Sequence, residues 1–308
     1  MQRREFLQRL GLGLAGAWAG SRLAWPRTAL GGGPELRLAL LADAHLPDGH
    51  AGSPEAQALA RAVAEIRALR PAPDLTLFAG DLAHAGDGPA LGLGREILMD
   101  LPGTLLLVPG EGDASPDSSG AWGQLFGEAG FLHTYQGLNL LGLYTAWLPT
   151  PIGPVFQVGE AQARWLAREL PRLDPETPLL ILSHAPLDRI FHPWQQWTGD
   201  AFRLLPLLGR FNEVLCLHGH VHQAGVRGQG SGVSRAVDHV PFMTGDLGQI
   251  AENRLSHQAI PATAWPLPVA LQGTPAALCP GQGPQGCGWG LVSHQQGAWH
   301  FHPQIWLA

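Results

Sequence analysis

The stretch LRLALLADAH, residues 36–45, joins a continuous apolar run to an aspartate and a histidine. Apolar runs of this length without alternation are typical of strands that are buried on both faces. Asp43 and His45 therefore lie where a predicted strand, Leu36–Ala42, ends. Both side chains can point to one side only if the chain turns there, and the following Leu46-Pro47 allows such a turn.

Four further clusters of polar side chains follow along the chain in a similar setting. They are Gly80-Asp81, Gly110-Glu111-Gly112-Asp113, Ser183-His184 and Gly219-His220-Val221-His222. Each ends or closely follows an apolar run of the β type. Ligands in α/β folds gather beyond the carboxyl ends of the strands, so these carboxylates and imidazoles are expected to meet. Such a set suits a hydrolytic site that holds two metal ions.

The remaining pattern alternates strands with helices and favours an α/β core. Predicted strands are 36–42, 74–79, 104–108, 179–183 and 213–217, with two short strands within 131–144; predicted helices are 54–70, 90–101, 121–126 and 159–173. Residues 223–285 are rich in Gly, Pro, Gln and Ser, and no regular element is predicted there. Segments 288–294 and 299–306 are expected to form a closing hairpin. We interpret residues 34–308 as one domain, with 223–308 irregular apart from that hairpin.

The five clusters, in this order, resemble the pattern of the calcineurin-like metallophosphoesterases, which is Asp-x-His, Gly-Asp, Gly-Asn-His-Asp, His and Gly-His-x-His. The resemblance covers nearly all of residues 34–308. It implies a four-layer α/β/β/α sandwich with the metal site at the strand C-terminal ends. It also implies a role for each ligand: Asp43, His45 and His222 bind the first metal, Asp81 bridges the two ions, and His184 and His220 bind the second. Two divalent or trivalent ions, Mn, Fe or Zn, are the expected cofactors.

The third cluster departs from that pattern, because Glu111 and Gly112 replace the usual Asn and His. Glu111 can still supply an oxygen ligand to the second metal. Its extra negative charge should hold cations more tightly and raise the pKa of bound water. The missing histidine usually helps to protonate the leaving group, so another group must do so. Candidates are His84, three residues past Asp81, and His192, in the loop after His184.

Two functions are consistent with these residues. The first is an exported metal-dependent hydrolase of phosphoric mono- or diesters, which uses a dinuclear metal centre and metal-bound hydroxide on a small phosphate-ester substrate. The alternative is a catalytically impaired binding or scaffold protein of the same fold that retains metal. Glu111 and Gly112 are the observation that keeps the alternative open, whereas the other ligands favour the hydrolase.

The N-terminus indicates export. Arg3-Arg4, then Phe6-Leu7 and a mild apolar stretch of about ten residues, resemble a twin-arginine signal within residues 1–33. That stretch is too short for a stable membrane span, which needs roughly 20 residues. The expected partner during export is the twin-arginine translocase, and the expected location is periplasmic or otherwise extracytoplasmic. The net charge of −6, with no Lys among the 19 basic residues, argues against nucleic-acid binding.

The three cysteines give one further expectation. Cys279 and Cys287 flank a turn-rich loop and could form a local disulfide in an oxidising compartment, or remain two unpaired thiols. Cys216 lies inside the apolar run of a predicted strand and is expected to be a small buried residue.

Overall fold

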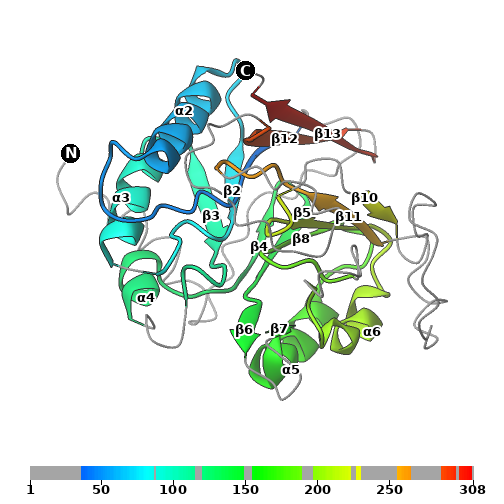
Figure 1. Cartoon of the computed structure of the whole chain (residues 1–308). Coiled ribbons are helices and arrows are strands. Elements are labelled where there is room, and N and C mark those ends of the chain that lie inside the picture. The colour runs from blue at the N-terminus through cyan, green and yellow to red at the C-terminus, as the bar shows by residue number, and fades with distance from the viewer. Residues whose placement is uncertain are drawn as a thin grey trace, which may run out of the picture.

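The structure is a computed structural model. It describes residues 36–86, 88–114, 120–148, 155–188, 197–222, 227–229, 255–264, 286–295 and 298–306. Two β-sheets face one another, with helices on the outer side of each (Figure 1). The predicted four-layer α/β/β/α sandwich is therefore confirmed. Within the described residues, no helix is long and apolar enough to cross a membrane.

Each sheet combines strands from distant parts of the chain. The first sheet contains, in spatial order, β13 (Ala298–Ile305), β12 (Gly288–Gln295), β1 (Leu36–Leu41), β2 (Leu75–Ala79) and β3 (Thr104–Val108). The second contains β10 (Arg227–Gln229), β11 (Leu255–Ala259), β9 (Val214–His218), β8 (Leu179–Ser183), β5 (Leu138–Leu143) and β4 (Phe131–Tyr135). β6 (Ala146–Leu148) and β7 (Val155–Gln157) form a separate small hairpin.

The helices cover the two outer faces. The first sheet carries α2 (Pro54–Ala68), α3 (Gly88–Leu98) and α4 (Ala121–Phe126); the second carries α5 (Gly159–Glu169), the 3-10 turns η1 (Leu170–Arg172) and η3 (Ala201–Arg203), and α6 (Leu205–Leu208). Helix α2 begins where the Ser53 hydroxyl accepts a hydrogen bond from the Ala56 N–H, with Pro54 at the first helical position. Its buried residues Leu59, Val63 and Ile66 recur at helical spacing and pack onto the first sheet.

The central strand β1 shows why an apolar run without alternation marks this fold. Leu38 and Leu40 point into the core between the two sheets, where they meet residues of β8 and β9. Ala39 and Leu41 point to the opposite face and pack under the helices. After Arg37 near its start, β1 is buried on both faces, and the next polar residue is Asp43, just past the end of the strand.

The C-terminal hairpin closes the first sheet. Strand β12 pairs antiparallel with β1, with Leu36 opposite His294 and Leu40 opposite Gly290. The Glu65 carboxylate of α2 accepts hydrogen bonds from the indole N–H groups of Trp289 (2.8 Å) and Trp306 (2.9 Å). Strands β12 and β13 are thus held to α2, the first helix of the described residues.

The structure contains elements that the sequence does not predict, among them β10 and β11 inside 223–285 and the short helical turns η3 and α6. Strand β11 lies inside 223–285, where no regular element is predicted, and it pairs in parallel with β9. Its sequence, Leu-Ser-His-Gln-Ala, buries the polar side chains of His257 and Gln258, so it lacks the apolar run that marks the other strands. The β6–β7 hairpin is also additional. The signal and linker at 1–33, His192 and Cys279 lie outside the described residues, while Cys216 and Cys287 are both buried.

Candidate metal centre

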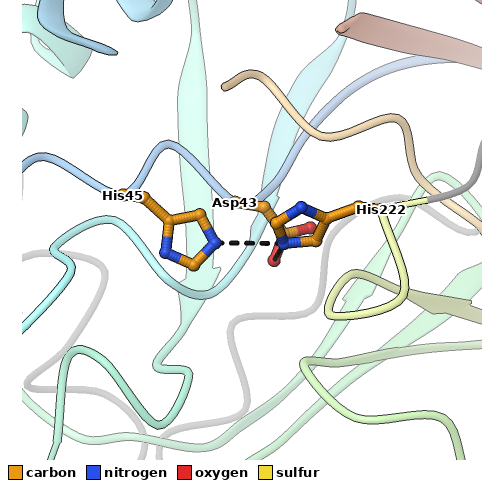
Figure 2. A group of neighbouring side chains, drawn as sticks. All are labelled: Asp43, His45 and His222. Atoms are coloured by element: carbon orange, nitrogen blue, oxygen red, sulfur yellow. Dashed lines mark hydrogen bonds and ion pairs between the residues drawn. The ribbon is translucent and has the colours of Figure 1, made fainter. Parts of the chain in front are cut away.

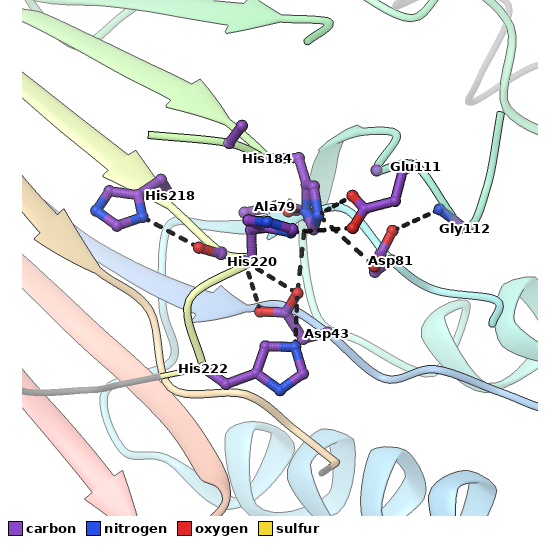
Figure 3. A network of polar contacts seen from close by, with 12 residues as sticks. Asp43, Ala79, Asp81, Glu111, Gly112, His184, His218, His220 and His222 are labelled. Atoms are coloured by element: carbon purple, nitrogen blue, oxygen red, sulfur yellow. Dashed lines mark hydrogen bonds and ion pairs between the residues drawn. The ribbon is translucent and has the colours of Figure 1, made fainter. Parts of the chain in front are cut away.

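The two sheets bring the polar clusters together at one edge. Parallel strands β1 and β2 end there in the first sheet, and parallel strands β8 and β9 end there in the second. The loops after them are joined by backbone hydrogen bonds, from the Asp43 N–H to the Gly80 carbonyl (2.9 Å) and from the Gly219 N–H to the His184 carbonyl (3.1 Å). Four clusters far apart in sequence therefore share one site (Figure 3).

The chain at this edge repeatedly adopts the left-handed backbone conformation. Among the described non-glycine residues with positive φ, all but Gln136 belong to the predicted ligand set: Asp43 (54°), His45 (48°), Asp81 (55°), His220 (64°) and His222 (54°). Such a conformation costs a non-glycine residue roughly 1–3 kcal/mol. These bends turn side chains two residues apart, such as Asp43 and His45, toward the same side. Strain of this kind persists only where the surrounding structure imposes it, and it clusters at functional sites.

The first ligand group consists of Asp43, His45 and His222, whose ligand atoms all lie within 4.8 Å of one another (Figure 2). The Nε2 atoms of the two histidines are 3.0 Å apart. Burial, together with the nearby His222, lowers the pKa of His45 to about 3, so this imidazole is neutral at pH 7. Burial raises the pKa of Asp43, but the neighbouring histidines outweigh it and lower this pKa to about 2. A neutral imidazole beside a carboxylate is the protonation state that metal binding requires.

The second ligand group consists of Glu111, His184 and His220. The Glu111 carboxylate lies between the two imidazoles, with Oε2 2.7 Å from His184 Nε2 and Oε1 3.0 Å from His220 Nδ1. On the other side of its ring, His184 Nδ1 is 2.7 Å from the carbonyl oxygen of Ala79. That carbonyl can only accept, so Nδ1 carries the donated proton and Nε2 faces the group. Figure 3 shows Glu111 and His184 pointing toward one another.

Asp81 lies between the two groups. Its Oδ2 is 3.7 Å from His45 Nδ1 in the first group and 3.6 Å from His184 Nε2 in the second. Its Oδ1 accepts a hydrogen bond from the Gly112 N–H (2.8 Å), which fixes the direction of the carboxylate. Asp81 also forms a third close set with Asp43 and His184. This is the position that the sequence assigns to the bridging ligand.

The donor set fits two metal ions. Burial and the charge of Glu111 raise the pKa of Asp81 well above its ordinary value. Despite burial, the carboxylates of Asp81 and Glu111 raise the pKa of His184 well above its ordinary value. Positive charge is therefore strongly favoured between these groups, and a cation supplies it.

Asp113 has a role that the sequence does not reveal. It is fully buried, and its two oxygens accept hydrogen bonds from the Ala83 N–H (2.8 Å) and the Gly110 N–H (3.0 Å). It thereby ties the loop that carries Asp81 to the loop that carries Glu111. The sequence does place Asp113 two residues after Glu111 in the same cluster. Sequence alone, however, does not distinguish a metal ligand from a residue that holds two loops together.

Glycine is required at two positions of these loops. A β-carbon built on Gly112 overlaps the carbonyl oxygen of Ala83 and lies 3.1 Å from that of His84. A β-carbon built on Gly110 overlaps the Asp81 carboxylate. The loops approach so closely that neither position has room for a side chain. This backbone therefore has no room for a side chain at position 112, where the family pattern has histidine.

The other candidates fall in different places. His84 is exposed at the rim, with its ring centroid 6.0 Å from that of His45. His218 is buried and directed away from the ligand cluster in Figure 3. Phe156 of β7 was not anticipated; its ring meets the His220 ring edge-on, with centroids 4.6 Å apart, and it is fully buried. It walls the second ligand group on the side of His220.

Comparisons with known proteins agree with this arrangement. A protein of Arcobacter nitrofigilis named "Probable glycerophosphodiester phosphodiesterase GpdQ" is 27% identical over 177 residues, which are 54% of this chain and 63% of that protein. The match thus spans less than two thirds of the relative's length. The crystal structure of a dimetal phosphatase from Danio rerio shares the fold, with a TM-score of 0.59 and 13% identity over 88% of this chain and 96% of that one. The sequence model described as calcineurin-like phosphoesterase matches residues 36–224, and the chain therefore belongs to the calcineurin-like phosphoesterase family.

Proposed function

We propose that the protein is a metal-dependent hydrolase of phosphoric mono- or diesters. The observation that carries this proposal is the position of Asp81, whose Oδ2 faces both ligand groups at nearly equal distance. Family membership supports the reaction class. The name of the Arcobacter nitrofigilis relative supports a small diester as the first substrate to test. The full set of ligand residues in one place does not favour the alternative of a binding or scaffold protein without turnover.

Two divalent cations at such a site polarise a phosphate ester and lower the pKa of water. The protein's own contribution is to hold the donors in place. The Ala79 carbonyl orients His184, and the Gly112 N–H orients Asp81. Phe156 closes the side of His220 against water. Preorganised donors of this kind need little rearrangement during the reaction, which is the largest contribution that a protein makes to such catalysis.

Removal of metal tests the proposal directly. We expect the purified protein to hydrolyse bis(p-nitrophenyl) phosphate or p-nitrophenyl phosphate, and to lose this activity after treatment with a chelator. Added Mn²⁺, Fe²⁺ or Zn²⁺ should restore turnover and raise Tm, because cations that bind only the folded state stabilise it. Absence of turnover on both esters with two bound metals per chain would instead support the scaffold alternative.

We also propose His84 as the group that protonates the leaving group, since it lies at the rim beside His45. His84→Asn should slow hydrolysis of alkyl phosphate diesters by roughly 10²-fold, the usual contribution of a general acid. Esters of p-nitrophenol need no protonation on departure and should be affected much less. An equal loss on both kinds of ester would contradict this role. His192, which lies outside the described residues, is the second candidate, and His192→Asn in the same assays distinguishes the two.

The resemblance of residues 1–33 to a twin-arginine signal leads us to propose export and a periplasmic or otherwise extracytoplasmic location. Arg3 and Arg4 carry the proposal. The test is fractionation of cells that express the full chain or its Arg3→Lys/Arg4→Lys variant. The wild-type protein should appear outside the cytoplasm and the variant should remain inside; equal distributions would contradict export by this route.

A further inference from the structure

Glu111 gives the second ligand group the same donors as the first. Each group has one carboxylate and two imidazoles: Asp43, His45 and His222 in the first, and Glu111, His184 and His220 in the second. Asp81 adds a carboxylate between them. An amide at position 111 would leave the second group without a charge of its own. With Glu111, the two groups have equal formal charge and equal donor types.

The geometry supports this equivalence. Both oxygens of Glu111 face imidazole nitrogens of their own group, at 2.7 and 3.0 Å. In the first group, Asp43 Oδ1 lies 3.5 Å from His222 Nε2. The Oδ2 of Asp81 is 3.7 Å from a nitrogen of the first group and 3.6 Å from one of the second. The shared carboxylate therefore favours neither group.

The carboxylates of Asp43 and Glu111 differ in their hydrogen bonds and in their exposure to water. Both oxygens of Asp43 accept a hydrogen bond from the His220 N–H, at 3.0 and 3.1 Å, which withdraws some of its negative charge. The Glu111 side chain is 27% exposed, whereas that of Asp43 is fully buried, so water screens the charge of Glu111 more. Each effect weakens the attraction of one group for a cation. The two effects therefore act on different groups.

We infer that this centre binds two like divalent cations with comparable affinity, so that both positions fill over the same range of metal concentration. Cations of the same charge and ligand preference suit donor sets that are alike in charge and type. The inference rests on the proposed function for the existence of a dinuclear centre. It concerns metal binding by the substrate-free protein, which is measured without turnover.

The test is a titration of the chelator-treated full chain with Mn²⁺. Electron paramagnetic resonance reports free Mn²⁺ and, separately, the exchange-coupled pair. For the wild type we expect two Mn²⁺ per chain, with Kd values within about tenfold of one another. Glu111→Gln keeps the length of the side chain but removes its charge; it should raise one Kd by roughly 10–100-fold and resolve two steps. Glu176→Gln is the matched control and should behave as wild type, because Glu176 is exposed and precedes β8, at the end of that strand opposite His184.

Two results would overturn the inference: wild-type steps separated by more than about tenfold, or a Glu111→Gln titration that matches the wild type. Both leave the proposed function intact, because two cations still bind. Fewer than two Mn²⁺ per wild-type chain would contradict the proposed dinuclear centre itself. The wild-type titration decides the main point even if Glu111→Gln does not fold, which circular dichroism of the metal-free variant checks.

Discussion

Asp81→Asn should lower kcat/KM for phosphate diesters by roughly a thousandfold or more, a loss typical of removing a central electrostatic group. The substitution removes a carboxylate whose Oδ2 faces both ligand groups at nearly equal distance. Asparagine should preserve the fold for two reasons. Its side-chain oxygen can still accept the Gly112 N–H, and asparagine tolerates the left-handed φ of 55° at this position better than most residues do.

The same variant separates metal binding from folding. Burial and the charge of Glu111 raise the pKa of Asp81, so ionised Asp81 destabilises the metal-free protein at neutral pH. Metal-free Asp81→Asn should therefore be at least as stable as metal-free wild type, whereas added Mn²⁺ should raise its Tm less. Asp174→Asn, at an exposed loop position, is the control. Activity within about tenfold of wild type would show that Asp81 is not the bridging ligand.

Gly112→His, which restores the histidine usual in the family, should lower both stability and activity. A β-carbon at this position overlaps the Ala83 carbonyl oxygen and lies 3.2 Å from Asp81 Oδ1. The loop must move, and the Gly112 N–H then loses its hydrogen bond to Asp81. Overpacking of this kind costs roughly 1–3 kcal/mol, and a backbone obstacle belongs at the upper end of that range. Thermal unfolding, metal content and diester hydrolysis measure the three effects.

Gly112→Ala isolates the steric part of this prediction, because it adds only the β-carbon. The matched control is Gly92→Ala in α3, where a β-carbon meets nothing within 4 Å. Gly92→Ala should stabilise the protein by roughly 0.5–1 kcal/mol, because alanine is favoured over glycine inside a helix. A Gly112→His variant that is as stable as wild type and more active would show that the loop has room for the side chain.

Residue type and position along predicted strands were enough to predict an α/β core and to bring the ligand residues to one edge, whereas the four-layer sandwich was predicted from the family resemblance. Asp43 and His45 stand out because polar residues follow a strand that is buried on both faces. The role of Asp113 was not predictable, since its significance lies in which backbone N–H groups of other loops it reaches. The same holds for Phe156, an ordinary apolar residue until the fold sets it against His220.

Strand β11 illustrates a different limit. His257 and Gln258 are buried there although their side chains are polar, so the pattern of apolar residues does not mark the segment as a strand. Pairing with β9, more than 30 residues away, determines the conformation of this segment instead. Close approaches between backbones, as at Gly112, are equally invisible in sequence, because a glycine that is needed for space looks like any glycine in a turn.

The contacts of residues near the C-terminus with β1 and α2 bear on the order in which the site is completed. Asp43 follows β1, which lies between β2 and the late strand β12, and its carbonyl accepts a hydrogen bond from the Ala264 N–H. Trp289 and Trp306 are in turn bound to Glu65 near the start of the fold. A growing chain on the ribosome holds every predicted ligand once residue 222 has been made, yet lacks the strand that flanks β1. The loop that carries Asp43 therefore has its neighbouring strand and its hydrogen bond from Ala264 only after every predicted ligand has been made.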